Sequence, residues 1–223
     1  MRKYHNKKIN PLINSLFGLT VMEPTLFFLY DVRVEGLEHL PRKGPAALAC
    51  KHWSWMDAFV LATRIPRTIN YLAKQELFEN LFGDYPGTFL YRVGKLLKPV
   101  TSRGLESLGC LRLDRDRPER YVSTFKILMR LITMDEYVGY FPEGKVVPGE
   151  MGEFKPGLTD LLVRMQKRTG IKIPFIPLGF NYREEKGKKT IITLRIGEGV
   201  FFEPGDCSAI LALREKIREL SML

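Results

Sequence analysis

Short apolar runs alternate with segments of helical periodicity along most of this 223-residue chain. Apolar runs of the kind that form strands occur at 32–34, 46–50, 69–73, 110–113, 137–141, 173–180 and 190–196. Segments that fit helices occur at 55–65, 75–82, 121–134, 158–168 and 208–220. Strands and helices in this order predict an α/β fold, with a mixed, mainly parallel β-sheet flanked by helices.

Proline and glycine weaken the pattern in two places. Pro174 and Pro177 lie within the run 173–180. Because proline cannot donate to a β-ladder, we expect an edge or irregular strand there. Glycine and proline also interrupt residues 85–103, and the pattern assigns no element to that segment.

The N-terminal residues 1–30 form a segment distinct from the predicted α/β domain at 31–223. A basic cluster precedes a mostly apolar stretch, which is divided by Glu23 and Pro24. Proline restricts the residue before it away from helical geometry, so two short apolar helices fit better than one membrane span. A basic flank beside such helices favours contact with a membrane surface. Packing of this segment on the domain core is the alternative.

The charge balance favours anionic partners. Lysine and arginine total 35 residues against 25 acidic residues, a formal net charge of +10. Phospholipid surfaces, phosphate-bearing substrates and an acidic carrier protein fit this charge, whereas no recognisable nucleic-acid-binding motif is present. The three cysteines show neither a CxxC pair nor metal-ligand spacing, so we expect no disulfide framework and no metal site. Without a recognisable cleaved signal, a reducing cytoplasmic compartment is expected.

A histidine follows the apolar run 46–50, in the sequence HWSWMD at 52–57. The carboxyl end of a strand in an α/β sheet is the usual place for chemistry. If a turn separates His52 from a helix that begins near Asp57, the carboxylate can accept a hydrogen bond from one imidazole nitrogen. The other nitrogen is then free to take a proton from a hydroxyl. His52 and Asp57 are therefore the candidate catalytic residues, with the hydroxyl supplied by a substrate.

Two other interpretations of these residues stay open. Ser54 and Asp57 have the spacing of an N-terminal capping pattern, in which the carboxylate reaches back to a backbone amide. Cys50 lies two residues before His52, on the same side of a strand, so a thiol nucleophile paired with histidine is a second alternative. A cysteine in an apolar run is more often a small buried hydrophobe.

Further motifs occur along the chain in a fixed order. They are VEGLEHLP at 34–41, GP at 44–45, HxSxxD at 52–57, AKQELF at 73–78, GCLRLDR at 109–115, FPEG at 141–144, FKPG at 154–157 and IPFIP at 173–177. This ordered set resembles the 1-acylglycerol-3-phosphate (lysophosphatidic acid) acyltransferase family of the glycerolipid acyltransferase superfamily. The resemblance covers residues 32–180.

The resemblance implies roles for the matching residues. His52 would be the general base that activates the acceptor hydroxyl, and Asp57 would orient it and balance its charge. Lys74 and Arg115 would bind the acceptor phosphate, because lysine supplies a point charge and arginine a bidentate fork. The activated oxygen would attack the acyl thioester directly, without a covalent acyl-enzyme.

The loop that carries the FPEG motif combines matches with departures. Glu143 and Gly144 would shape the acceptor-binding site. Val146 stands where the family usually has an arginine, which puts one phosphate contact in question, and Lys145 is the neighbouring residue that would compensate. Lys51, before the histidine, stands where the family commonly has asparagine.

The resemblance also sets the expected reaction and its setting. We expect an acyltransferase of phospholipid biosynthesis that uses acyl-CoA or acyl carrier protein as co-substrate and needs no cofactor. Its partners would be a lysophospholipid acceptor, the thioester donor and a membrane surface, with no nucleic acid. The protein would lie at the cytoplasmic face of the membrane as a peripheral or monotopic protein. The alternatives are transfer to another lysolipid or hydroxylated lipid, and non-enzymatic binding to anionic surfaces.

Overall fold

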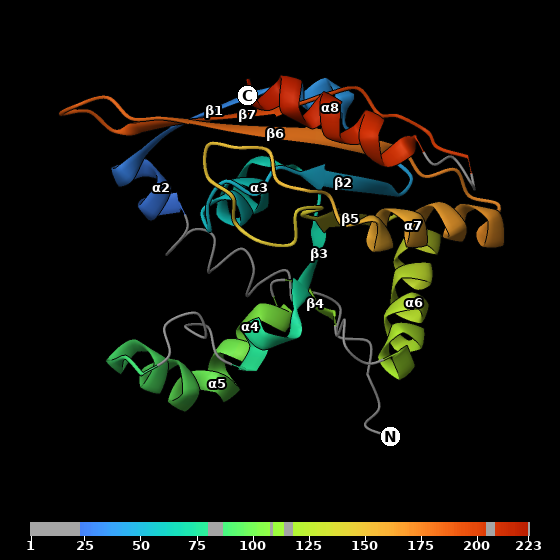
Figure 1. Cartoon of the computed structure of the whole chain (residues 1–223), viewed down its shortest axis with the longest axis horizontal. Coiled ribbons are helices and arrows are strands. Elements are labelled where there is room, and N and C mark those ends of the chain that lie inside the picture. The colour runs from blue at the N-terminus through green and yellow to red at the C-terminus, as the bar shows by residue number, and fades with distance from the viewer. Residues whose placement is uncertain (1–22, 80–86, 108, 114–117, 204–207, 223) are drawn as a thin grey trace.

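The strands of the described residues form one seven-stranded sheet (Figure 1). The computed structural model describes residues 23–79, 87–107, 109–113, 118–203 and 208–222. The strands are β1 (Tyr30–Glu35), β2 (Ala46–Cys50), β3 (Ile69–Lys74), β4 (Cys110–Leu113), β5 (Tyr137–Tyr140), β6 (Phe175–Arg183) and β7 (Thr190–Ile196). Their order is β1-β7-β6-β2-β5-β3-β4, and only the β6–β7 pair is antiparallel. The predicted mixed, mainly parallel sheet is confirmed.

Helices cover both faces of this sheet. They are α2 (Glu23–Leu29), α3 (Asp57–Arg64), α4 (Gln75–Glu79), α5 (Phe89–Ser107), α6 (Pro118–Thr133), α7 (Pro156–Thr169) and α8 (Ala209–Ser221). Buried side chains of α2 and α3 belong to one hydrophobic core, and those of α6, α7 and α8 belong to the other. Figure 1 shows α8 along one side of β6 and α3 on the opposite side. The predicted α/β layering is therefore present.

Strand β2 separates the two cores, and its alternation decides which way the residues after it face. Ala47 and Ala49 belong to the core of α6, α7 and α8. Ala46, Leu48 and Cys50 belong to the core of α3. Because successive side chains of a strand point to opposite faces, the residues that follow the strand are set to reach opposite sides of the sheet.

Strand β6 is internal, which corrects the expectation of an edge strand at 173–180. It pairs with β2 on one side and with β7 on the other. Pro177 is tolerated because it acts only as an acceptor there: the Gly197 amide donates to its carbonyl at 2.9 Å. The regular ladder with β7 ends at Ile196, and an isolated bridge joins Val200 and Phe175 beyond it. The irregularity that proline predicts is thus present, as the end of the regular β6–β7 ladder next to Pro177.

Helix α5 occupies most of the segment to which the sequence assigned no element. It spans Phe89–Ser107 and contains Pro99. Proline removes one intrahelical donor. Contacts with α4 and with β4 nevertheless hold the segment in a helix, and Figure 1 shows α4 and α5 together beside β3 and β4.

Helix α2 begins at the Glu23-Pro24 division and presents two different faces. Leu26 is buried in the core with α3, and Glu23 forms an ion pair with Arg64 of α3. The following side chains at 27–29 are more than half exposed. No helix among the described residues is both long and apolar enough to cross a membrane. The basic cluster and the first apolar helix expected within 1–30 lie outside the described residues.

Candidate active site

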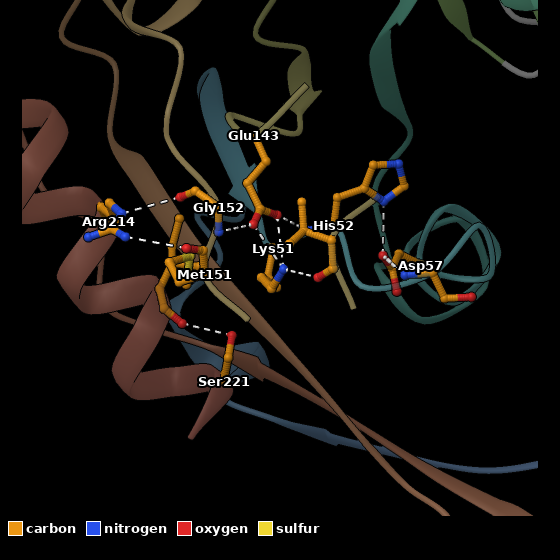
Figure 2. Close-up of polar contacts among 11 residues, drawn as sticks. Lys51, His52, Asp57, Glu143, Met151, Gly152, Arg214 and Ser221 are labelled. Carbon is orange, nitrogen blue, oxygen red and sulfur yellow. Dashed lines mark hydrogen bonds and ion pairs between the residues drawn. The ribbon is translucent and has the colours of Figure 1, made fainter. Parts of the chain in front are cut away.

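His52 and Asp57 meet at the carboxyl end of β2 (Figure 2). The imidazole Nδ1 lies 3.0 Å from the carboxylate Oδ2. His52 lies in the turn after β2 and Asp57 is the first residue of α3, so the turn that the spacing requires is present. The His52 side chain is 19% exposed, whereas the Asp57 side chain is fully buried. A partly exposed imidazole is thus in contact with a fully buried carboxylate.

The hydrogen bonds of Asp57 define the tautomer of the imidazole. Its Oδ2 accepts from the Ser54 backbone amide at 2.8 Å as well as from His52. Its Oδ1 accepts from the Tyr182 hydroxyl at 2.7 Å. Because a carboxylate only accepts hydrogen bonds, Nδ1 of His52 carries a hydrogen, so the lone pair of the neutral imidazole lies on Nε2. Within the described residues, Nε2 has no hydrogen-bond partner.

The same carboxylate makes the backbone contact that the capping interpretation predicts, although the residue that precedes α3 is Met56, which makes no side-chain capping bond. Asp57 reaches back to the backbone amide of Ser54, and the Ser54 hydroxyl accepts from the Met56 amide at 3.3 Å. These contacts resemble a capping box, in which side chains at the start of a helix bond backbone amides reciprocally. The two interpretations of the spacing therefore do not exclude each other, because one oxygen of Asp57 bonds both the Ser54 amide and the imidazole.

Residues of the loop after β5 hold the backbone and ring of His52. The ring stacks on Phe141, with ring centroids 4.0 Å apart. The His52 amide donates to Glu143 Oε2 at 2.8 Å, and its carbonyl accepts from the Val147 amide at 2.8 Å. Both backbone groups of the histidine are therefore engaged, and only the ring edge is open.

Lys51 forms a buried ion pair with Glu143 directly beside the histidine (Figure 2). Its Nζ lies 2.9 Å and 3.1 Å from the two carboxylate oxygens, and both side chains are 0% exposed. Nζ also donates to the Val147 carbonyl at 2.5 Å, and the Gly152 amide donates to Glu143 at 2.7 Å. Glu143 is thus buried and bonds the backbone on both sides of the turn, and its predicted part in shaping the acceptor site stays a prediction.

The departure at Lys51 is explained by this pair, although sequence reasoning assigned it no role. The other supporting residues that it missed are Phe141 and Tyr182. The contacts of Lys51, Phe141 and Tyr182 join strands that are far apart in the sequence. Only Lys51 carries a signal in the sequence, because a lysine precedes the histidine where the family commonly has asparagine.

The loop from β5 to α7, residues 141–155, carries the remaining site predictions. Gly144 has a positive φ of 67°, and its amide donates to the Phe141 carbonyl at 3.0 Å, so the turn itself favours glycine. Lys145 and Val146 are exposed at the turn that follows. Their contact with an acceptor stays a prediction.

The two residues predicted to bind phosphate are less well placed by the structure. Lys74 is the last residue of β3. Both β3 and β2 are parallel to β5, so their carboxyl ends lie at the same end of the sheet. The Lys74 side chain and all of Arg115 lie outside the described part of the chain. Their role in phosphate binding stays a prediction.

Cys50 does not fit the nucleophile alternative. Its side chain is buried in the core with α3, and its Sγ lies 3.6 Å from the Leu48 carbonyl oxygen. Burial, and secondarily the Asp57 carboxylate, raise the pKa of the Cys50 thiol well above its usual value. A neutral, enclosed thiol is a poor nucleophile, so the cysteine is a packing residue.

Comparisons with known proteins identify the family of the chain. The family model described as Acyltransferase matches residues 31–181. Over 114 residues the chain is 32% identical to the 1-acyl-sn-glycerol-3-phosphate acyltransferase of Bacillus subtilis (strain 168), an alignment that covers 51% of this chain and 47% of that relative. The chain thus spans about half the length of the curated relative that it matches.

A solved structure supports the fold. The crystal structure of the 1-acyl-sn-glycerophosphate (LPA) acyltransferase PlsC from Thermotoga maritima superposes with a TM-score of 0.52 and 19% identity. The superposition covers 95% of this chain and 76% of that one. The family match spans more than half of the chain and contains both His52 and Asp57, and the chain belongs to the Acyltransferase family.

Proposed function

We propose that this protein transfers a fatty acyl chain from an acyl thioester to the hydroxyl of a lysophosphatidate-like acceptor, as a step of phospholipid biosynthesis. The observation that carries the proposal is the 3.0 Å contact between His52 Nδ1 and a buried Asp57, which leaves Nε2 without a hydrogen-bond partner among the described residues on a side chain that is 19% exposed. The names of the Bacillus subtilis and Thermotoga maritima proteins support the acceptor class.

In the proposed reaction, Nε2 of His52 accepts the proton of the acceptor hydroxyl as its oxygen attacks the thioester carbonyl carbon. The buried Asp57 carboxylate stabilises the imidazolium that forms. The carbon–sulfur bond then breaks, and the leaving thiolate takes the proton back from His52. The products are an ester and a free thiol, so no covalent acyl-enzyme and no cofactor are needed. Acyl-CoA and acyl carrier protein are the two candidate donors.

Phosphate recognition is proposed along the same edge of the sheet. Lys74 is the last residue of β3. Because β3 and β2 are both parallel to β5, Lys74 lies at the same end of the sheet as His52. Lys145 is exposed in the loop beside Val146, the position at which the family usually has arginine. We infer that Lys74, Arg115 and Lys145 supply the positive charge for the acceptor phosphate.

The exposed side of α2 supports a membrane location. Phe27 is 68% exposed, Phe28 is 69% exposed, and Leu29 follows them. Contiguous exposed aromatic and aliphatic side chains are typical of segments that lie in a membrane interface. We infer peripheral or monotopic binding at the cytoplasmic face, where a lipid acceptor is available.

An acyl-transfer assay tests the chemistry. Lysophosphatidate is supplied with acyl-CoA or acyl carrier protein, and the product is resolved by mass. We expect His52→Ala to lower the rate by about 1,000-fold or more without changing thermal stability. His39→Gln is the matched control, because the Nδ1 of His39 bonds the Ile196 carbonyl at 2.7 Å and takes no part in the proposed site. Undiminished turnover in His52→Ala would reject the mechanism.

Two further assays test the acceptor and the location. In a panel of lysolipids and other hydroxylated lipids, exclusive use of a phosphate-free acceptor would overturn the phosphate assignment. For the membrane, we expect Phe27→Ser/Phe28→Ser to lose binding to anionic vesicles. Leu211→Ser is the matched control, since Leu211 is 65% exposed on α8. Equal vesicle binding by the two variants would contradict the role of α2.

A further inference from the structure

We propose that Tyr182 is a positioning residue of the acyl-transfer site, which holds the Asp57 carboxylate in the orientation that Asp57 in turn imposes on His52. This inference rests on the proposed general-base role of His52. Tyr182 lies in β6, one residue beyond the end of the family match at 181. The residues that the family model matches therefore do not include it.

Both oxygens of the Asp57 carboxylate accept hydrogen bonds. Oδ2 is bound by His52 and by the Ser54 amide, whereas Oδ1 is bound by the Tyr182 hydroxyl at 2.7 Å. Because Asp57 is fully buried, water does not readily replace a lost partner. Without the hydroxyl, Oδ1 would be a buried acceptor left unpaired, and the carboxylate would be free to rotate away from the imidazole.

The surroundings keep the tyrosine hydroxyl a donor. Burial, and then the neighbouring Asp57 carboxylate, raise the pKa of Tyr182 well above its ordinary value. The phenol therefore stays protonated at any working pH. Since a carboxylate only accepts, the hydrogen bond has one possible direction, from Tyr182 to Asp57.

The tyrosine is itself fixed by the sheet. Leu178 and Phe180 belong to the core with α3, and Tyr182 packs against the same core as the next residue of that face. Its backbone pairs with Ile192 of β7, and its ring stacks on Trp53 with centroids 5.8 Å apart. A donor carried by a paired strand and a stacked ring holds its target more firmly than one on a loop.

Tyr182→Phe isolates the hydroxyl, because phenylalanine keeps the ring and its stacking on Trp53. We expect kcat to fall about tenfold, the effect of losing one hydrogen bond to a charged group, while KM for both substrates is unchanged. Tyr140→Phe is the matched control. Tyr140 is also a buried tyrosine, and its hydroxyl bonds Thr159 at 3.1 Å in the other core, away from the site. We expect this control to keep the wild-type kcat.

A double-mutant comparison separates positioning from stability. In an Asp57→Ala background, Tyr182→Phe should cause no further loss of rate, because the residue through which it acts is gone. A structural role would lower the rate equally in both backgrounds. Such an equal loss would overturn the proposal, and so would a kcat of Tyr182→Phe equal to that of Tyr140→Phe.

The same series distinguishes this inference from the proposed function. If His52→Ala retains turnover, the general-base mechanism itself fails. If His52→Ala is inactive while Tyr182→Phe has the kcat and KM of the wild type, only the positioning role fails.

Discussion

Asp57 and Glu143 are two buried carboxylates that contact neighbouring residues of the turn after β2, and their partners differ. Asp57 is five residues from His52 and holds an imidazole that is 19% exposed. Glu143 is 92 residues from Lys51 and holds an ammonium group that is 0% exposed. Because neighbouring residues of an extended chain point to opposite faces, Lys51 and His52 reach different carboxylates. The local pair contains a partly exposed ring, whereas the distant pair is fully buried and connects β2 to the β5–α7 loop.

The charge balance of the two sites differs in the same way. Asp57 is bound by the imidazole, an amide and a phenol. Glu143 is bound by the Lys51 Nζ and by the amides of His52 and Gly152. Loss of charge at Asp57 should therefore appear in the rate of acyl transfer. Loss of charge in the Lys51–Glu143 pair should appear in the free energy of unfolding.

The largest effect is expected from Asp57→Asn, which keeps the shape of the side chain and removes its charge. Without the carboxylate, the imidazolium formed during proton transfer loses its partner, so kcat should fall about 1,000-fold with little change in thermal stability. Steady-state kinetics measure this loss. Asp160→Asn, an exposed aspartate on α7, is the control. A wild-type kcat in Asp57→Asn would remove the distinction between the two carboxylates.

The next effect is expected from Lys51→Met, which leaves the Glu143 carboxylate buried without its cation. We expect the free energy of unfolding in urea to fall by about 3 kcal/mol or more. In Lys51→Met/Glu143→Gln the uncompensated charge is gone, so most of that loss should be recovered.

An exposed ion pair provides the control for this prediction. Lys188 pairs with Glu185 at 2.8 Å, and its side chain is 72% exposed. Lys188→Met should cost about 1 kcal/mol at most. If the double variant is less stable than Lys51→Met alone, the buried pair does not act through its charge.

How far the sequence predicts the site follows from how local each contact is. The spacing from His52 to Asp57 predicts their contact because it needs only a strand end, a turn and a helix start. The pairing of Lys51 with Glu143 requires β2 and β5 to be neighbours, and the contact of Tyr182 with Asp57 requires β6 beside β2. Apolar runs do not specify strand order, so these contacts could not be derived from the pattern.

The fold shows the same limit. Strands such as 46–50 and 190–196 were predicted with the bounds that the structure has, because alternation and apolar runs are local signals. The central place of β6 and the helix at Phe89–Ser107 were not predicted. In both cases the local preference of proline opposes the structure that forms, and contacts with neighbouring elements outweigh that preference.

A smaller effect is expected from Ser54→Ala. The hydroxyl accepts a hydrogen bond from the Met56 amide at 3.3 Å in the turn before α3, so its loss should cost about 1 kcal/mol of stability. The contact with Asp57 comes from the Ser54 backbone and is kept, so kcat should stay near the wild-type value. Urea unfolding and kinetics on the same sample measure both. A loss of rate as large as that of Asp57→Asn would mean that the hydroxyl itself belongs to the site.

The smallest effect on the rate is expected from Cys50→Ala. Cys50 and His52 lie on the same side of β2, but Cys50 pairs with Leu178 in the ladder and is 1% exposed. Its raised pKa keeps the thiol protonated near pH 8, so iodoacetamide should leave Cys50 unmodified in the folded protein and alkylate it in urea. Mass mapping of each cysteine measures this difference. Alkylation of Cys50 in the folded protein with loss of acyl transfer would restore the thiol alternative. Protection of Cys50, together with full activity of Cys50→Ala, would leave His52, which follows β2, as the candidate catalytic residue.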